Sequence, residues 1–76
     1  MSTDERDHAA RTARIEAAAA TYRAAHAAYS QARAELFDEI LAGLGEDMGP
    51  SAAARASGFT REYIARIRDG KVKREL

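Results

Sequence analysis

The sequence predicts an all-α protein in which one long N-terminal helix precedes two short helices. Alanine, the strongest helix former, occurs 19 times in 76 residues, and β-branched residues are few. No proline or glycine interrupts the chain before Gly43, whereas Pro50, Gly58 and Gly70 divide the remainder into short segments. We therefore divide the chain into an oligomerisation helix, residues 1–35, and a small head, residues 36–76.

Composition limits what so short a chain can do. A domain of this size buries about 60% of its unfolded surface and often needs oligomerisation, disulfides or a metal. There is no cysteine, and His8 and His26 lie 18 residues apart, which leaves oligomerisation. No apolar run approaches the ~20 residues that span a bilayer, and the charged start MSTDERDHAA predicts a cytoplasmic protein with no membrane partner. Because we find no nucleophile–base pair, metal-ligand spacing or phosphate-loop pattern, we expect no enzyme activity, cofactor, metal or small-molecule ligand.

Residues 2–42 carry the signals of one uninterrupted helix. Ser2 and Glu5 have the spacing of a capping box, and Gly43 and Gly45 supply stop signals. A helix of about 40 residues is on the order of 60 Å long, several times the usual length. The rest of the chain is too short to cover it, so we expect a partner.

An apolar heptad runs along this predicted helix. Large residues recur every seven positions, and an alanine follows each of the first three at a three-residue offset. This seam consists of Ile15, Ala18, Tyr22, Ala25, Tyr29, Ala32 and Leu36. Because alanine lets two backbones approach closely, we expect a coiled-coil or bundle homodimer, or a higher homo-oligomer; the alternative is a solvent-exposed alanine helix. The flanking charges suit parallel and antiparallel pairing alike, so the orientation stays open.

Towards its end the helix carries a wider apolar stripe. The stripe has the spacing of a core-facing surface and comprises Leu36, Phe37, Ile40, Leu41 and Leu44. We expect this stripe to form the first helix of a three-helix head.

Turn signals divide the rest of the chain. Pro50 suits the first position of a helix, and Gly58 can adopt the positive φ of a tight turn. Thr60 is placed to N-cap a second helix that ends at Gly70. The pattern predicts an eight-residue helix, a three-residue turn and a nine-residue helix.

This stretch resembles the helix-turn-helix of Cro/C1-type repressors, and of small actinobacterial, phage and plasmid regulators of that kind. The run GFTREYIARIRDGK (58–71) matches the repressor pattern of a glycine, an apolar residue, a Ser or Thr and two further apolar residues, with small Ala54 at the helix crossing. Ser57 departs from that pattern, in which an apolar residue precedes the turn glycine. Part of the run is also similar to the promoter-recognition motif of sigma factors. The expected interhelical contacts are Ala53, Phe59, Ile64 and Ile67.

Charge is distributed unevenly although the formal net charge is zero. Residues 1–49 carry a net charge of −4 and residues 50–76 one of +4. Such an asymmetry favours a polyanion-binding end, although a solvated basic tail would look the same.

The resemblance implies that the second helix of the pair enters the major groove of double-stranded DNA. The expected base-reading residues are Thr60, Arg61, Glu62, Ala65 and Arg66. Arginine can grip guanine, glutamate can accept from cytosine N4, and alanine can contact a thymine methyl group. Glu62 and Arg66 could instead form an i, i+4 ion pair. The expected phosphate contacts are Ser51, Arg55, Arg68, Lys71, Lys73 and Arg74.

We therefore expect a dimeric, sequence-specific DNA-binding protein, a repressor-like regulator of transcription at the nucleoid. The alternatives are a helical protein-interaction adaptor and a non-specific architectural DNA-binding protein. Residues 71–76 are too few for a winged hairpin, and we expect a frayed basic arm or a short helical extension.

Overall fold

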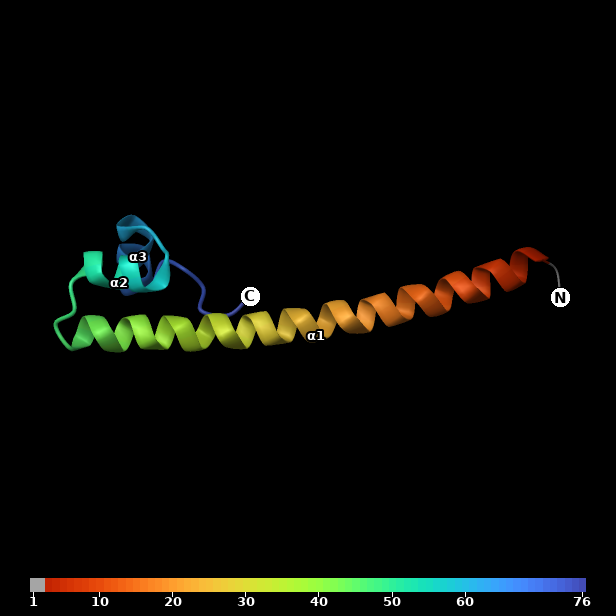
Figure 1. The fold of residues 1–76 in the computed structure, drawn as a ribbon, viewed down its shortest axis with the longest axis horizontal. Helices are drawn as coiled ribbons and strands as arrows, with labels where there is room; N and C mark the ends of the chain where they lie inside the picture. Colours follow the sequence, from red (N-terminus) through yellow and green to blue (C-terminus); the bar gives the residue numbers. More distant parts are fainter. Residues whose placement is uncertain (1–2) are drawn as a thin grey trace.

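The computed structural model describes the backbone of residues 3–76 and the side chains of residue 6 and residues 8–76. This part of the chain forms three helices and no strand: α1 (Thr3–Gly45), α2 (Pro50–Ser57) and α3 (Arg61–Arg68). The two short helices pack on the last third of α1, and the N-terminal part of α1 projects beyond them as a rod (Figure 1). The all-α class with a long N-terminal helix is confirmed. None of the described helices is long and apolar enough to cross a membrane.

The end of α1 differs from the expected one. The helix passes through Gly43 and ends at the second predicted stop glycine, Gly45, three residues beyond Ala42, and Asp47 then adopts the left-handed conformation, with φ of 67°. Met48 N–H donates to the carbonyl of Gly43 at 3.0 Å, which closes the last turn. Aspartate tolerates this conformation better than most residues, so a glycine is not required there. The expected capping box of Ser2 and Glu5 lies outside the described side chains.

The core lies where all three helices meet. Phe37 is 2% exposed and Ile64 is fully buried, and the side chains packed with them come from every helix. The other members of this cluster are Ile40, Ala53 and Ile67, surrounded by Leu44, Ala54, Phe59, Tyr63 and Val72. All the interhelical contacts expected from the sequence are therefore present.

Two residues of the expected wide stripe lie outside this core. Leu36 is 36% exposed and Leu41 is 42% exposed. The head covers only the side of α1 that carries Phe37, Ile40 and Leu44, so the prediction was wrong for Leu36 and Leu41.

The ends of the two short helices lie close to where the sequence predicts them. Gly58 has φ of 82° and its N–H donates to the carbonyl of Ala54 at 2.9 Å, which ends α2. The Thr60 hydroxyl accepts a hydrogen bond from Tyr63 N–H at 3.1 Å, which confirms the expected N-cap. Gly70, with φ of 72°, closes α3 after eight residues rather than nine.

The chain after Gly70 is neither a frayed arm nor a helical extension. It turns back and runs over the middle of α1, where the C-terminus lies (Figure 1). Val72 packs against the core at the start of this segment. The basic tail is thus part of the folded head.

The left-handed conformation of Gly58 gives a stability prediction. We expect Gly58→Ala to lower the free energy of unfolding by about 1–2 kcal/mol, because a Cβ disfavours positive φ. Gly45→Ala is the matched control, since neither glycine has a heavy atom within 4 Å of the added Cβ and only Gly58 has positive φ. In helical Gly45 the same change should raise stability by about 0.5–1 kcal/mol. Urea unfolding followed by circular dichroism at one protein concentration measures both; equal effects would contradict the assignment to φ.

Candidate nucleic-acid interface

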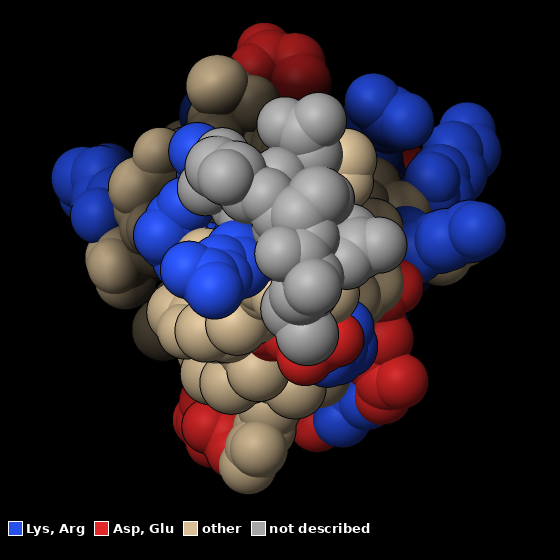
Figure 2. Space-filling view, turned by 90° about the vertical axis from the view of Figure 1, so that its right-hand side faces the viewer, with Lys and Arg blue, Asp and Glu red and all other residues tan. Residues whose placement is uncertain are grey.

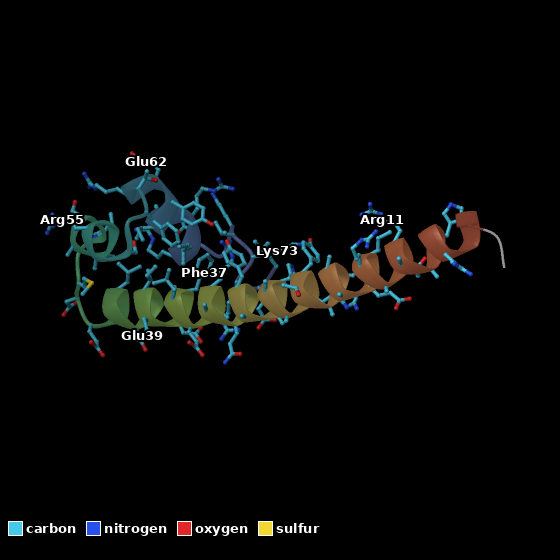
Figure 3. The ribbon with its side chains drawn as sticks, turned by 45° about the vertical axis from the view of Figure 1, so that its right-hand side comes forward. Arg11, Phe37, Glu39, Arg55, Glu62 and Lys73 are labelled. Carbon is cyan, nitrogen blue, oxygen red and sulfur yellow. The ribbon has the colours of Figure 1, made fainter. Side chains whose placement is uncertain are left out.

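The outer face of α3 is polar and held in a fixed orientation. Ile64 and Ile67 are buried on the side of α3 that faces the core, so the residues on the opposite side of this helix point away from the core. Figure 3 shows Glu62 at the side of the head furthest from α1. The expected base-reading residues are placed together on this face: Thr60, Arg61, Glu62 and Arg66 are exposed and Ala65 is half-buried.

This face continues onto the start of α2. A shallow hollow of about 380 Å³ is lined by Arg61, Glu62, Ala65 and Arg68 of α3 and by Pro50 of α2. No side chain caps the N-terminus of α2, so N–H groups of its first turn remain available to an anion. Ser51, an expected phosphate contact, lies half-buried in that first turn. The structure therefore brings one expected phosphate site next to the expected base readers.

The basic side chains of α3 differ in how far their charge is already neutralised. Among the described residues, neither Arg61 nor Arg66 takes part in an ion pair, and the alternative pair with Glu62 is not formed. Arg68 Nε instead donates to Asp69 at 3.1 Å. This hydrogen bond lowers the pKa of the Asp69 carboxyl group and raises the pKa of the Arg68 guanidinium. Among the described residues, the uncompensated positive charge of α3 is thus carried by the two expected guanine-binding arginines, and Glu62 is likewise in no ion pair.

Arg74, another expected phosphate contact, is held against α1. Its Nε donates to Asp38 Oδ1 at 2.7 Å, and its Nη1 donates to Glu75 Oε1 at 2.7 Å. The hydrogen bond from Arg74 is the largest cause of the lowered pKa of Asp38, and the pKa of Arg74 is raised in return. A phosphate would have to compete with two carboxylates for this guanidinium.

The remaining expected phosphate contacts are exposed but dispersed. Arg55, Lys71 and Lys73 all face solvent. Figure 3 shows Arg55 and Lys73 at opposite ends of the head. These cations surround the α3 face rather than forming one cluster.

Arg33 is a structurally important residue that the sequence did not reveal. Its guanidinium donates to the Tyr63 hydroxyl at 3.0 Å and to the carbonyl of Lys73 at 3.0 and 3.2 Å. It also lies 4.5 Å from the centroid of the Phe37 ring. The hydrogen bond to Tyr63 is the main cause of its raised pKa. Its polar partners lie 30 and 40 residues away in the chain, so no local pattern indicates them.

Positive charge flanks the head as a whole. Figure 2, which looks along α1 from its N-terminal end, shows lysine and arginine side chains on both sides of the upper part, one acidic group at the top and most other acidic groups below. This arrangement can attract a polyanion to the face that carries α3.

No protein-family model matches the chain, and neither a curated protein nor a solved structure matches it.

The ion pair between Arg74 and Asp38 gives a pH prediction. The folded-state pKa of Asp38 lies below its ordinary value of 3.8. The stabilisation that the ionised carboxylate gives to the folded protein is therefore complete above that pH and is lost as the pH falls further. We expect residues 74–76 to detach in acid, while Val72 and the contacts of Arg33 keep the preceding residues in place. Amide heteronuclear NOE values of residues 74–76 measure the detachment.

Two variants assign this transition to its cause. Asp38→Asn should detach residues 74–76 already at neutral pH and abolish the acid transition. Asp69→Asn removes the other carboxyl group with a lowered pKa and should leave the transition in place. An acid transition that persists in Asp38→Asn would show that another group holds the tail.

Proposed function

We propose that the protein binds double-stranded DNA sequence-specifically, with α3 in the major groove, as a regulator of transcription. One observation carries the proposal: α3 is locked to the head by Ile64 and Ile67 while Arg61, Glu62 and Arg66 project outwards. A recognition helix needs this division between a buried and a reading face. The resemblance of residues 58–71 to Cro/C1-type repressors supports the same function.

The proposed base contacts follow from the chemistry of the outer face. Arg61 and Arg66, which form no ion pair with any described residue, carry donors that suit the O6 and N7 atoms of guanine. Glu62 suits the N4 amino group of cytosine, and Ala65, in the floor of the hollow, suits a thymine methyl group. The N-terminal turn of α3 thus supplies both polar and apolar readout.

The proposed phosphate contacts surround these residues. The first turn of α2, with Ser51, begins at Pro50, which lines one hollow with Arg68, and Arg55 is exposed later on the same helix. Lys71 and Lys73 supply charge from the tail, and Arg74 contributes only where DNA displaces Asp38 and Glu75. A head of this size makes a small footprint, so we propose that two copies act together as a nucleoid-associated, repressor-like homodimer.

The exposed seam of α1 favours a second candidate function, association with other proteins. Its large residues are Ile15, Tyr22, Tyr29 and Leu36, and all are exposed. An adaptor that worked through this seam would bind DNA weakly and with no dependence on Arg61. A non-specific architectural protein would bind DNA through charge alone and would recover no sequence motif.

Selection from a randomised duplex library at about 150 mM salt tests the proposal, because weak backbone-only binding largely fails at that salt. We expect a two-part motif. Arg61→Ala should cost about 1–3 kcal/mol of binding free energy at one base position and relax the preference there. Lys71→Ala should weaken binding to all sequences alike. It should also reduce the slope of the logarithm of the binding constant against the logarithm of the salt concentration by about 1, the effect of losing one phosphate contact.

Arg23→Ala is the matched control, since it removes the same charge from an exposed position of α1 remote from the head. If Arg61→Ala and Arg23→Ala bind the selected duplex equally well, α3 does not read DNA. Recovery of no motif would instead favour the architectural protein or the adaptor.

A further inference from the structure

The N-terminal two-thirds of α1 exposes a single apolar stripe. Between residues 8 and 35 the only large apolar side chains are Ile15, Tyr22 and Tyr29, and all three lie on the seam. They are 60%, 71% and 54% exposed. The tail does not cover them, because its last residues lie against another side of α1, next to Ala27 and Ser30.

The stripe ends in a notch beside the head. One hollow of about 280 Å³ is lined by Tyr29, Ala32, Arg33, Leu36 and Phe59. A second, of about 240 Å³, lies on the other side of Leu36 and reaches Met48 and Ala56. A helix laid along the seam would therefore cover the stripe and both hollows together.

We propose that this surface binds a second copy of the chain, with the two α1 helices antiparallel and Tyr22 facing Ala25 of the second copy. In this register Ile15 faces Ala32, and Tyr29 faces Ala18. Each of these three large residues then packs on an alanine, so their layers have a similar thickness and the helices can approach closely, while Leu36 faces Arg11 at the end of the seam. Parallel pairing would instead stack tyrosine on tyrosine and alanine on alanine. The tyrosine layers would then hold the helices too far apart for the alanine layers to pack.

Charge complementarity selects the same register. The positions that flank the seam bring Arg14 opposite Glu35 of the second copy, and symmetry makes this pair twice. His8 also faces Glu39. The expectation that the flanking charges suit both orientations alike does not hold for this pair, because a parallel dimer would place Arg14 beside Ala19 and Glu35 beside Ile40, with no charge partner for either.

Other antiparallel registers lack this match. A shift of one heptad in either direction separates Arg14 from Glu35. Residue size alone does not separate them, because the register with Ile15 opposite Glu39 also places three of the four large seam residues on alanines. The Arg14–Glu35 pairs therefore select the register with Tyr22 facing Ala25.

The geometry of the rod agrees with this register. The two-fold axis of this dimer falls between residues 23 and 24, next to the midpoint of the described part of α1, Thr3–Gly45. The described parts of both helices are thus paired along their whole length. Ile15 of the second copy arrives over Ala32, in the hollow lined by Tyr29 and Phe59.

The pairing places the two heads at opposite ends of the rod. The heads pack over Phe37 and Ile40, so their centres lie about 45 Å apart along the axis at 1.5 Å per residue. This distance exceeds the roughly 34 Å that separates successive turns of DNA. Taken with the proposed function, on which this step rests, the dimer addresses two separated sites rather than adjacent half-sites.

Spin labels test the pairing without DNA, so its failure leaves the proposed function untouched. The chain has no cysteine, and exposed Ala10 and Ala24 occupy equivalent heptad positions. In labelled Ala10→Cys we expect a spin–spin distance of at least about 40 Å, because 27 residues separate the two labels along the axis. In Ala24→Cys we expect less than about 25 Å, set by the interhelical spacing and the labels. Equal short distances at both positions would show a parallel pair, and no intermolecular distance at either would show a monomer; each overturns the proposal.

Charge reversal tests the register itself. Arg14→Glu and Glu35→Arg should each weaken dimerisation about tenfold in low salt, because two attractive pairs become two repulsive ones. The double variant has the composition of the natural chain and should restore it, as should mixing the two single variants. Sedimentation equilibrium measures all four. Single variants that dimerise as tightly as the natural chain would overturn the register.

Discussion

Phe37 is the side chain through which all three helices are joined. Its ring meets the rings of Phe59 and Tyr63 edge-on, at centroid distances of 6.3 Å in both cases. Arg33 covers the same ring and, through Tyr63 and the carbonyl of Lys73, ties α3 and the tail to α1. Burying a phenylalanine contributes about 1.5–3 kcal/mol, which is a large share of the stability of a domain this small. The orientation of the α3 face therefore depends on contacts made on its opposite side.

Local chemistry explains why the short helices could be predicted from the sequence. The N-cap at Thr60 and the positive φ of Gly58 and Gly70 depend only on neighbouring residues. The end of α1 could not be predicted in the same way, because glycine is tolerated inside a helix and Met48 folds back over Gly43. The docked tail was missed because its partners, Arg33 and Asp38, lie 36 to 40 residues away in the chain.

Helical periodicity accounts for most of what was predicted at the candidate interface. Once Ile64 and Ile67 are assigned to the core, the outward position of Arg61, Glu62 and Arg66 follows from the 3.6-residue repeat. Periodicity does not reveal which cations are already neutralised. Arg74 and Arg61 are both exposed arginines of one basic segment, yet only Arg74 is held by carboxylates. That difference arises from tertiary structure and decides which of them is available to a ligand.

The position of Leu36 links the stability of the head to the proposed pairing of the rods. This residue is the last of the seam, and it also separates the two hollows that open between α1 and the head. A second copy laid in the notch would remove water from Leu36 and from Met48, which is 43% exposed. Pairing would then add apolar burial to a core cluster of five buried residues. Since a partner that binds only the folded state stabilises it by mass action, the head should become more stable as the protein concentration rises. In such a dimer the paired α1 helices stabilise each head and also set the distance between the two heads.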